Sequence, residues 1–290
     1  MLSVKEIRNN ISGIKNTNRI TKTMEMISIS KMKKIYFRMN SSMSYYNLIC
    51  KVVNNVKNIN LEYKHIYLKK KIKVKIICII ILSTDKGLCG NLNINLFSKV
   101  LSEIKKYSKK NIKVKLAIIG EKGINFFKLF SKNIIFKISN LKDIPSFSKI
   151  TIFLSNIIKL YKKNIVEKIY LAGNNFISST FFKSSIFRLL PIYKKLHKKK
   201  LNKFNWDYIY EPNSKFLLDI LFKRYLEYTI YYKILENSSC EQSSRIFSMK
   251  QASKNSNDII KKLQLMYNKS RQANVTKELI EIVSGYSAIL

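Results

Sequence analysis

Apolar residues between Ser3 and Lys57 recur in three groups in which spacings of three and four dominate, with polar residues between them. This spacing is typical of one face of an α-helix. The stripe comprises Ile7, Ile11, Ile14, Ile20, Met24, Ile27, Ile35, Met39 and Met43. The segment has no proline and one glycine, and Ser3 with Glu6 fits a capping box at its start. The pattern predicts one helix of roughly 80 Å.

The pattern changes in the middle of the chain. "KVKIICIIILSTDKGLCGNLNINLF" is a short β-branched apolar run, then a glycine turn, then an amphipathic segment. "VKLAIIGEKGINFFKLF" repeats this order, and "VEKIYLAGN" is a third strand that ends in glycine. "SSIFRLLPIY" and "WDYIY" resemble further strands, and the basic stretch "KKLHKKKLNKFN" between them is typical of an exposed loop. Strands that alternate with helices predict a parallel or mostly parallel α/β sheet.

After Pro212 there is no glycine or proline until Gly285. Asn213 or Ser214 could cap a helix that continues for about 70 residues, roughly 105 Å. A compact domain of this size does not contain two such helices, so we expect them to pair as an antiparallel coiled coil. The expected fold is therefore α/β with long α-helices. A Rossmann-like domain (residues 70–212) is inserted between an N-terminal helix (1–60) and a C-terminal helix (213–290).

The amino-acid composition adds little to the fold that the sequence pattern predicts. The chain has 290 residues, of which 46% are hydrophobic, and this excludes a disordered chain. Its net charge of +38 would suit nucleic acid or an anionic membrane surface, but an AT-biased genome also produces many lysines. A basic nucleic-acid-binding protein stays open as an alternative. Most tyrosines, however, fall on helical stripes or in strands and not among exposed basic residues.

Cysteines, histidines and apolar runs restrict the class of protein. Four cysteines without a CxxC pair predict reduced thiols in a cytosolic compartment. His65 and His197 are too far apart in sequence to suggest a metal site. The N-terminal "MLSVKEIRNN" lacks the apolar core of a signal peptide, and the run Ile76–Leu82 is too short to span a bilayer. We expect a soluble protein, or one that partners hold at a membrane.

Two glycine-containing turns follow predicted strands, where phosphates are often bound. "STDKGLCGNLN" and "GEKG" nevertheless match neither GxGxxG nor GxxxxGK[ST], so a tight, closely packed turn is the favoured interpretation. A dinucleotide-binding enzyme would need the glycine fingerprint, which these two turns lack. With no carboxylate pair or Cys/His arrangement, we expect neither a cofactor nor an enzymatic activity in this chain alone.

The C-terminal helix thins out to small polar residues at Ser270, Ala273, Asn274 and Thr276. A helix that only filled a core would not place such residues there. A basic cluster on the first helix includes Lys31 and Lys34, with Arg38 one turn further. Together with Arg245 and Arg271 these side chains could form a positive collar. Such a collar would suit an acidic protein partner or an RNA backbone.

Four stretches together resemble the gamma subunit of bacterial F-type ATP synthases. They are "IRNNISGIKNTNRITKTMEMISISKMKK" (7–34), "STDKGLCGNLNINLF" (83–97), "WDYIYEP" (206–212) and "EQSSRIFSMKQASKNSNDIIKKLQLMYNKSRQANVTKELIEIVSG" (241–285). Their order and spacing cover essentially the whole chain. One departure is Asn91 after Gly90, where the family often has a second glycine. Another is that "LHKKKLNKFNW" has no cysteine pair, so the redox switch of chloroplast relatives should be absent.

The resemblance implies a central rotor shaft. Its two terminal helices would stand inside a ring of alpha and beta subunits, and its α/β domain would contact the epsilon subunit and the c ring. Proton flow would turn the c ring and the shaft, which couples rotation to ATP synthesis or hydrolysis at the beta subunits. The chain itself would be non-catalytic, would meet the membrane only through the complex and would not bind nucleic acid. Its location would be the cytoplasmic face of the bacterial inner membrane.

The resemblance also assigns individual residues. Arg271 and Gln272 match contacts to a catch loop on beta, and Thr276 could join them. Met24 and Arg245 match positions of the same zone. Three further lysines would face acidic loops of beta through non-directional attraction: Lys31, Lys33 and Lys34. Tyr208 and Glu211 match positions near epsilon and the c ring.

Overall fold

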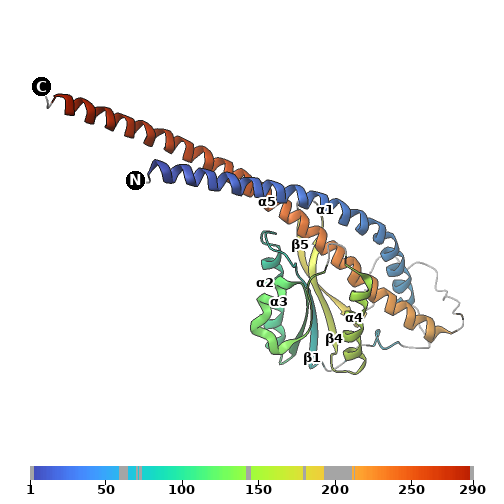
Figure 1. Cartoon of the computed structure of the whole chain (residues 1–290). Helices are drawn as coiled ribbons and strands as arrows, with labels where there is room; N and C mark the ends of the chain where they lie inside the picture. Colours follow the sequence, from blue (N-terminus) through green and yellow to red (C-terminus); the bar gives the residue numbers. More distant parts are fainter. Residues whose placement is uncertain are drawn as a thin grey trace. The chain divides into compact units, whose positions relative to one another are not determined.

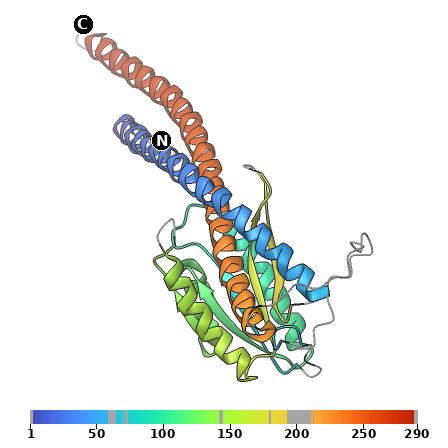
Figure 2. The same ribbon diagram turned by 90° about the vertical axis from the view of Figure 1, so that its right-hand side faces the viewer.

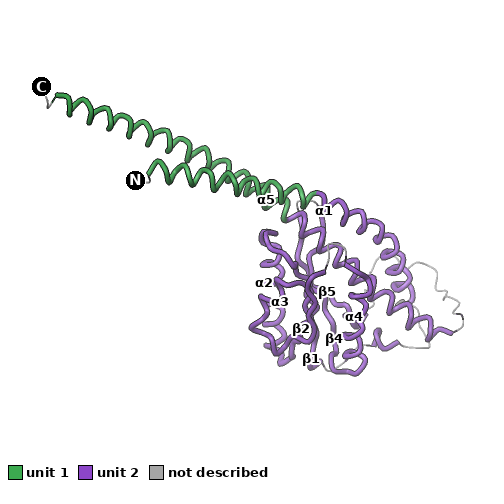
Figure 3. Tube along the Cα trace, in the orientation of Figure 1, with its two compact units in different colours: residues 1–29, 245–290 green, residues 30–244 purple. Residues whose placement is uncertain are grey.

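The computed structural model describes residues 3–58, 65–69, 71, 74–141, 145–178, 181–192, 211 and 213–287. The chain forms two compact units, unit 1 (residues 1–29 and 245–290) and unit 2 (residues 30–244), and both long helices contribute to each (Figure 3). In chain order the elements are α1 (Val4–Asn58), β1 (Ile76–Leu82), α2 (Leu92–Ser108), β2 (Lys113–Ile119), α3 (Glu121–Phe126), the 3-10 helix η1 (Phe127–Asn133), β3 (Ile134–Ile138), α4 (Phe147–Lys162), β4 (Lys168–Phe176), β5 (Phe182–Leu190) and α5 (Ser214–Ser287) (Figure 1).

Unit 2 is built on a five-stranded sheet in the order β3-β2-β1-β4-β5. The pairs β1–β2, β2–β3 and β1–β4 are parallel, and β5 adds to β4 as an antiparallel edge strand. The predicted mostly parallel α/β sheet is thus confirmed, including the strand expected in "SSIFRLLPIY". The strand expected in "WDYIY" lies outside the described residues.

Helices cover both faces of this sheet, which is why β1 is apolar at every position. One face packs Ile77, Ile79 and Ile81 of β1 against α2. The other face packs Cys78, Ile80 and Leu82 against α4 and the part of α5 that belongs to unit 2 (Figure 2). Because successive strand residues point to opposite faces, a single uninterrupted apolar run supplies both cores.

The ends of the long helices follow the local sequence signals. At the start of α1, the Ser3 backbone N–H donates to Glu6 Oε2 (2.8 Å) and the Glu6 N–H donates to Ser3 Oγ (3.2 Å), which confirms the capping box. At the start of α5, the Phe216 N–H donates to Asn213 Oδ1 (2.9 Å), so Asn213 is the capping residue.

Within unit 2, α1 and α5 run antiparallel, as expected. Ser239 Oγ lies 3.7 Å from Met39 Sδ, whereas further along α1 the ring of Tyr46 stacks on Tyr232 with centroids 4.5 Å apart. Rising numbers on one helix therefore meet falling numbers on the other. The expected division into segments 1–60, 70–212 and 213–290 stays a prediction.

Candidate functional site

The seam between α1 and α5 in unit 1 follows a seven-residue repeat that is only partly apolar. On α1 the buried or half-buried positions are Val4, Ile7, Ile11, Ile14, Asn18, Thr21, Glu25 and Ser28. On α5 they include Met249, Ser253, Ser256, Ile260, Leu263, Tyr267 and Ser270. This alternation of three and four is the repeat of a coiled coil. After Ile14, however, the α1 side of the seam is polar.

Hydrogen bonds satisfy Asn18, Thr21 and Ser28 in this polar part of the seam. Asn18 Nδ2 donates to Asn257 Oδ1 (2.8 Å), and Ser253 Oγ donates to Asn18 Oδ1 (2.6 Å). The Thr21 and Ser28 hydroxyls donate to carbonyl oxygens one turn earlier in their own helix (2.9 and 2.8 Å). Polar pairs at seam positions fix the register of a coiled coil better than they stabilise it. The seam of unit 1 is therefore slim and specific in register.

The apolar residues of this part of α1 face outward instead. Ile20, Met24 and Ile27 are 58%, 37% and 50% exposed. Their spacing predicts a helical stripe, and the structure places this part of the stripe outside the seam, because the repeat of seven brings Asn18, Thr21 and Ser28 into the seam. Apolar groups on the outer face of a helix pair with a polar seam are typical of a surface that a partner covers. Met24, one of the predicted contacts, belongs to this outer stripe.

The last part of α5 has no buried side chain among its described residues. Every residue from Arg271 to Ser287 is exposed, including Gln272 and Thr276. The Thr276 hydroxyl donates to the Gln272 carbonyl (2.9 Å), so it lies along its own helix. An exposed apolar stripe shares this segment: Val275, Leu279, Ile282, Val283 and Tyr286. The predicted catch residues thus lie on a slender, fully accessible surface.

The predicted basic contacts belong to both units. In unit 2, Lys31 is half-buried and Lys33 and Lys34 are exposed on α1. In unit 1, Arg271 is exposed on α5, whereas Arg245 is only 9% exposed. The collar that these residues would form stays a prediction. At the other predicted contact, Glu211 is exposed and Tyr208 lies outside the described residues.

The glycine turn at α3 is closed by the chain itself. Asp85 Oδ1 accepts the Glu121 N–H, the Thr84 carbonyl accepts the Lys122 N–H, and Ser83 Oγ accepts the Gly123 N–H, each at 3.0 Å. These are the donors that a bound phosphate would use. A tight turn filled by the Ser83–Asp85 loop is therefore the correct interpretation of "GEKG".

Buried titratable groups in unit 2 include Cys78 and His65. Burial raises the pKa of the Cys78 thiol to about 12, so it stays protonated. His65 Nδ1 accepts the Tyr67 N–H (3.1 Å), which leaves its proton on Nε2 for Asp219 Oδ1 at 2.6 Å. Burial lowers the pKa of His65, and Asp219 opposes this effect. The pair links the segment after α1 to the start of α5.

The described residues offer neither a metal site nor a membrane-spanning helix. Across residues 3–58, 213–287 and the described parts between them, no cluster of three His, Cys, Asp or Glu side chains could hold a metal ion. No helix in this part of the chain combines the length and apolar character needed to cross a membrane.

Comparisons with known proteins agree on one family. A family model described as ATP synthase matches residues 3–289. The ATP synthase gamma chain of Buchnera aphidicola subsp. Baizongia pistaciae (strain Bp) is 46% identical over 290 residues, which covers 100% of this chain and 99% of that protein. The gamma chain of subsp. Melaphis rhois is 47% identical over 291 residues, with the same coverage.

Solved structures share the fold at lower identity. The OSCP/F1/c-ring structure of the Euglena gracilis mitochondrial ATP synthase in rotational state 3 contains a chain with a TM-score of 0.70 and 20% identity. The match covers 99% of this chain and 94% of that one. A rotor structure of the same enzyme in rotational state 1 gives a TM-score of 0.65 at 19% identity, over 94% and 98% of the two chains.

Proposed function

The chain belongs to the ATP synthase gamma-chain family, and from this membership we propose how its two long helices meet their partners. As a member of the family it is the non-catalytic central shaft of a rotary motor, which couples proton-driven rotation to ATP synthesis or hydrolysis at the beta subunits. We place the alpha and beta subunits around unit 1 and the adjoining part of α1, and the epsilon subunit and the c ring against the α/β sheet domain. The complex would hold the chain at the cytoplasmic face of the bacterial inner membrane.

The observation that carries this proposal is the partly inverted polarity of the helix pair in unit 1, where α1 is polar in the seam after Ile14 and apolar on its outer face. A seam with hydrogen bonds from Asn18 keeps the register fixed, so the pair resists twisting. Apolar and small polar residues lie on the outside, where Ile20, Ile27 and the segment Arg271–Ser287 are exposed. A shaft needs both properties. It must be torsionally stiff inside, and outside it must form many shallow contacts in place of a few deep ones that would stop rotation.

Particular residues have particular roles in this proposal. Arg271, Gln272 and Thr276 contact a catch loop of a beta subunit, and Met24 and Arg245 contribute to the same zone. Lys31, Lys33 and Lys34 attract acidic loops of beta, and this attraction depends little on the rotary angle because it is long-range. Glu211, with Tyr208, meets epsilon and the c ring. The long helices at 1–60 and 213–290 then form the shaft and residues 70–212 its foot.

Reconstitution tests this function. Matching alpha and beta subunits are assembled with and without the full chain, and ATP hydrolysis is measured. Omission of the chain should leave little activity. The triple variant Arg271→Ala, Gln272→Ala, Thr276→Ala should assemble but hydrolyse ATP about tenfold more slowly, which corresponds to about 1.4 kcal/mol of lost coupling.

A matched control lies on the same exposed segment. Lys277 and Glu281 form an exposed i,i+4 ion pair with Nζ and Oε1 3.5 Å apart, so their double alanine variant should lose little activity. Equal losses in both variants would refute the assignment of the catch residues. If alpha and beta neither bind nor respond to the chain, the proposed shaft is wrong, and salt-dependent RNA binding becomes the next measurement.

A further inference from the structure

Strand β4 extends beyond the last residue of β1 that pairs with it. Along this unpaired edge of β4, side chains of helix α5 accept the hydrogen bonds that a neighbouring strand would accept. The pairing of β1 with β4 ends at Ile81 and Ala172. Beyond that point the backbone N–H groups of Asn174 and Phe176 point away from β5, because alternate residues of a strand present their donors to the same edge. Ile177, between them and the turn, donates instead toward β5, to Phe181 O (3.1 Å).

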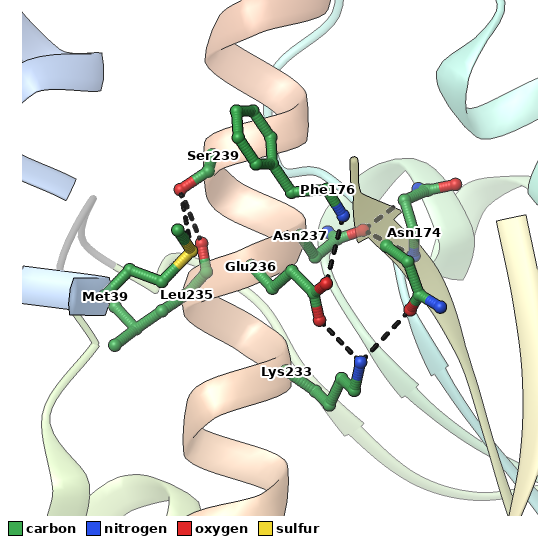
Figure 4. A network of polar contacts seen from close by, with 9 residues as sticks. Met39, Asn174, Phe176, Lys233, Leu235, Glu236, Asn237 and Ser239 are labelled. Atoms are coloured by element: carbon green, nitrogen blue, oxygen red, sulfur yellow. Dashed lines mark hydrogen bonds and ion pairs between the residues drawn. The ribbon is translucent and has the colours of Figure 1, made fainter. Parts of the chain in front are cut away.

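Two consecutive residues of α5 accept these donors. Asn237 Oδ1 accepts the Asn174 N–H (3.3 Å), and Glu236 Oε1 accepts the Phe176 N–H (3.0 Å). Three of these four residues are buried: Glu236 is 7% exposed, Asn237 4% and Asn174 1%, whereas Phe176 is half-buried. Figure 4 shows the two side chains reaching from the helix toward the strand.

Further bonds tie the same side chains together. Lys233 Nζ lies 2.6 Å from Glu236 Oε2 and donates to Asn175 Oδ1 (3.2 Å). Asn237 Oδ1 also accepts from Asn174 Nδ2 (2.9 Å), and Asn174 Oδ1 accepts from Ser184 Oγ of β5 (2.7 Å). We call Lys233, Glu236 and Asn237 with their β4 partners the α5–β4 lock.

Stability alone does not explain this network. A buried ion pair is no better than well-packed apolar side chains at holding a helix on a sheet, and it carries a desolvation penalty. Apolar contacts are non-directional, so they resist separation more than rotation. Hydrogen bonds are directional, and the next residue of a helix is turned by about 100°, so a slip of one residue breaks every bond of the lock.

We propose that Lys233, Glu236 and Asn237 are positioning residues that make α5 turn with the α/β sheet when the rotor is under load. This inference rests on the proposed function, in which the sheet domain receives torque and the long helices deliver it. The rest of the interface in unit 2 is mainly apolar: it packs Leu218, Phe222, Leu226 and Ile230 of α5 against the core. The lock supplies directional contacts to this attachment, as does the bond from Ser244 Oγ to Cys89 O (2.6 Å) nearer the end of α5 in unit 2.

The test uses the complete ATP synthase in inverted membrane vesicles that carry the full chain. The double variant Glu236→Ala, Asn237→Ala removes both acceptors for the β4 backbone. With an uncoupler present, so that the rotor runs without load, its ATP hydrolysis per assembled complex should match that of the unmodified chain. Without the uncoupler, the steady pH gradient that ATP hydrolysis maintains should be lost or clearly reduced.

Two further variants keep the test decisive. Asn237→Asp retains an acceptor oxygen for both Asn174 donors and should restore the gradient when Glu236 is unchanged. Ser239→Ala is the matched control: Ser239 is buried one turn along the same helix, but its hydroxyl donates to Leu235 O (3.1 Å) and faces Met39 of α1, not β4. It should leave the gradient intact.

The possible results distinguish a failure of the proposed role of the α5–β4 lock from a failure of the proposed function. A variant whose gradient falls only in proportion to its content of assembled complex overturns the inference, since the lock would then be purely structural. Equal loss in Ser239→Ala would overturn it as well. If the unmodified chain fails to assemble or to pump at all, the proposed function fails before the lock is tested.

Discussion

Replacing Gly120 by alanine should disrupt the turn between β2 and α3. Gly120 has φ +104° and ψ 140°, a region that residues with a side chain rarely enter. A Cβ there would lie 2.4 Å from the Ser83 carbonyl oxygen and 2.6 Å from Ser83 Oγ. The Ser83 backbone is itself held by its N–H bond to Ile119 O (2.8 Å), so relief requires movement of the strand ends.

The expected loss of stability follows from these two effects. The strained backbone costs about 1–3 kcal/mol. The collision with a fixed backbone atom costs a further 1–3 kcal/mol, roughly, as in overpacked cores. We therefore expect Gly120→Ala to lower the free energy of unfolding of unit 2 by about 2–6 kcal/mol.

Gly13 is the matched control, because a Cβ at that position meets nothing within 4 Å. It lies in the interior of α1, where alanine is favoured over glycine, so Gly13→Ala should stabilise the helix by about 0.5–1 kcal/mol. Urea unfolding of the full chain, followed by circular dichroism, measures both changes. If Gly120→Ala proves as stable as Gly13→Ala, the described geometry of the turn is wrong.

Three further substitutions each remove one polar side chain and should change stability. Asp85→Ala removes a carboxylate that accepts one backbone N–H at α3 and another after β3, so urea unfolding should show a loss of about 2–4 kcal/mol, whereas Lys86→Ala on the same loop should show little. Because burial lowers the pKa of His65, its contribution to stability is present above its unfolded pKa of about 6.5 and is lost as the pH falls through the folded pKa. Thermal unfolding between pH 5 and pH 8, roughly the range that histidine titrates, should therefore be flatter for His65→Gln, and an unchanged slope would refute this. Asn18→Ala should weaken the helix pair of unit 1 by about 1–2 kcal/mol, seen as earlier loss of helix signal on heating, whereas Asn16→Ala on the exposed face should not.

Local signals in the sequence were sufficient for the ends and types of the elements. The capping box at Ser3, the cap at Asn213 and the apolar run of β1 each act over a few residues, so their effect could be predicted directly. The same holds for the order of strands and helices in unit 2, where alternation of β-branched runs and amphipathic segments predicts a parallel sheet.

Contacts between distant segments were harder to predict. The apolar spacing around Ile20 and Met24 indicated a helix, but not that its seam would run through Asn18 and Thr21, because a polar repeat of seven has no strong signal of its own. The α5–β4 lock was missed for a related reason. The side-chain oxygens of Glu236 and Asn237 meet β4 backbone donors only because β4 extends beyond the end of β1. The sequence of α5 gives no information on how far these two strands pair. A charged residue such as Glu236 in a stretch that is otherwise buried is the one hint available.

The hydrogen bonds of Asn18 also constrain how the protein is made. Its partner Asn257 follows 239 residues later, so the N-terminal helix has no seam to join until nearly the whole chain has left the ribosome. At typical synthesis rates that wait lasts roughly 10 to 50 seconds. During this time the outer stripe and the unfilled seam of α1 are both open to water. We therefore expect the α/β domain to begin folding before the helix pair of unit 1 can form.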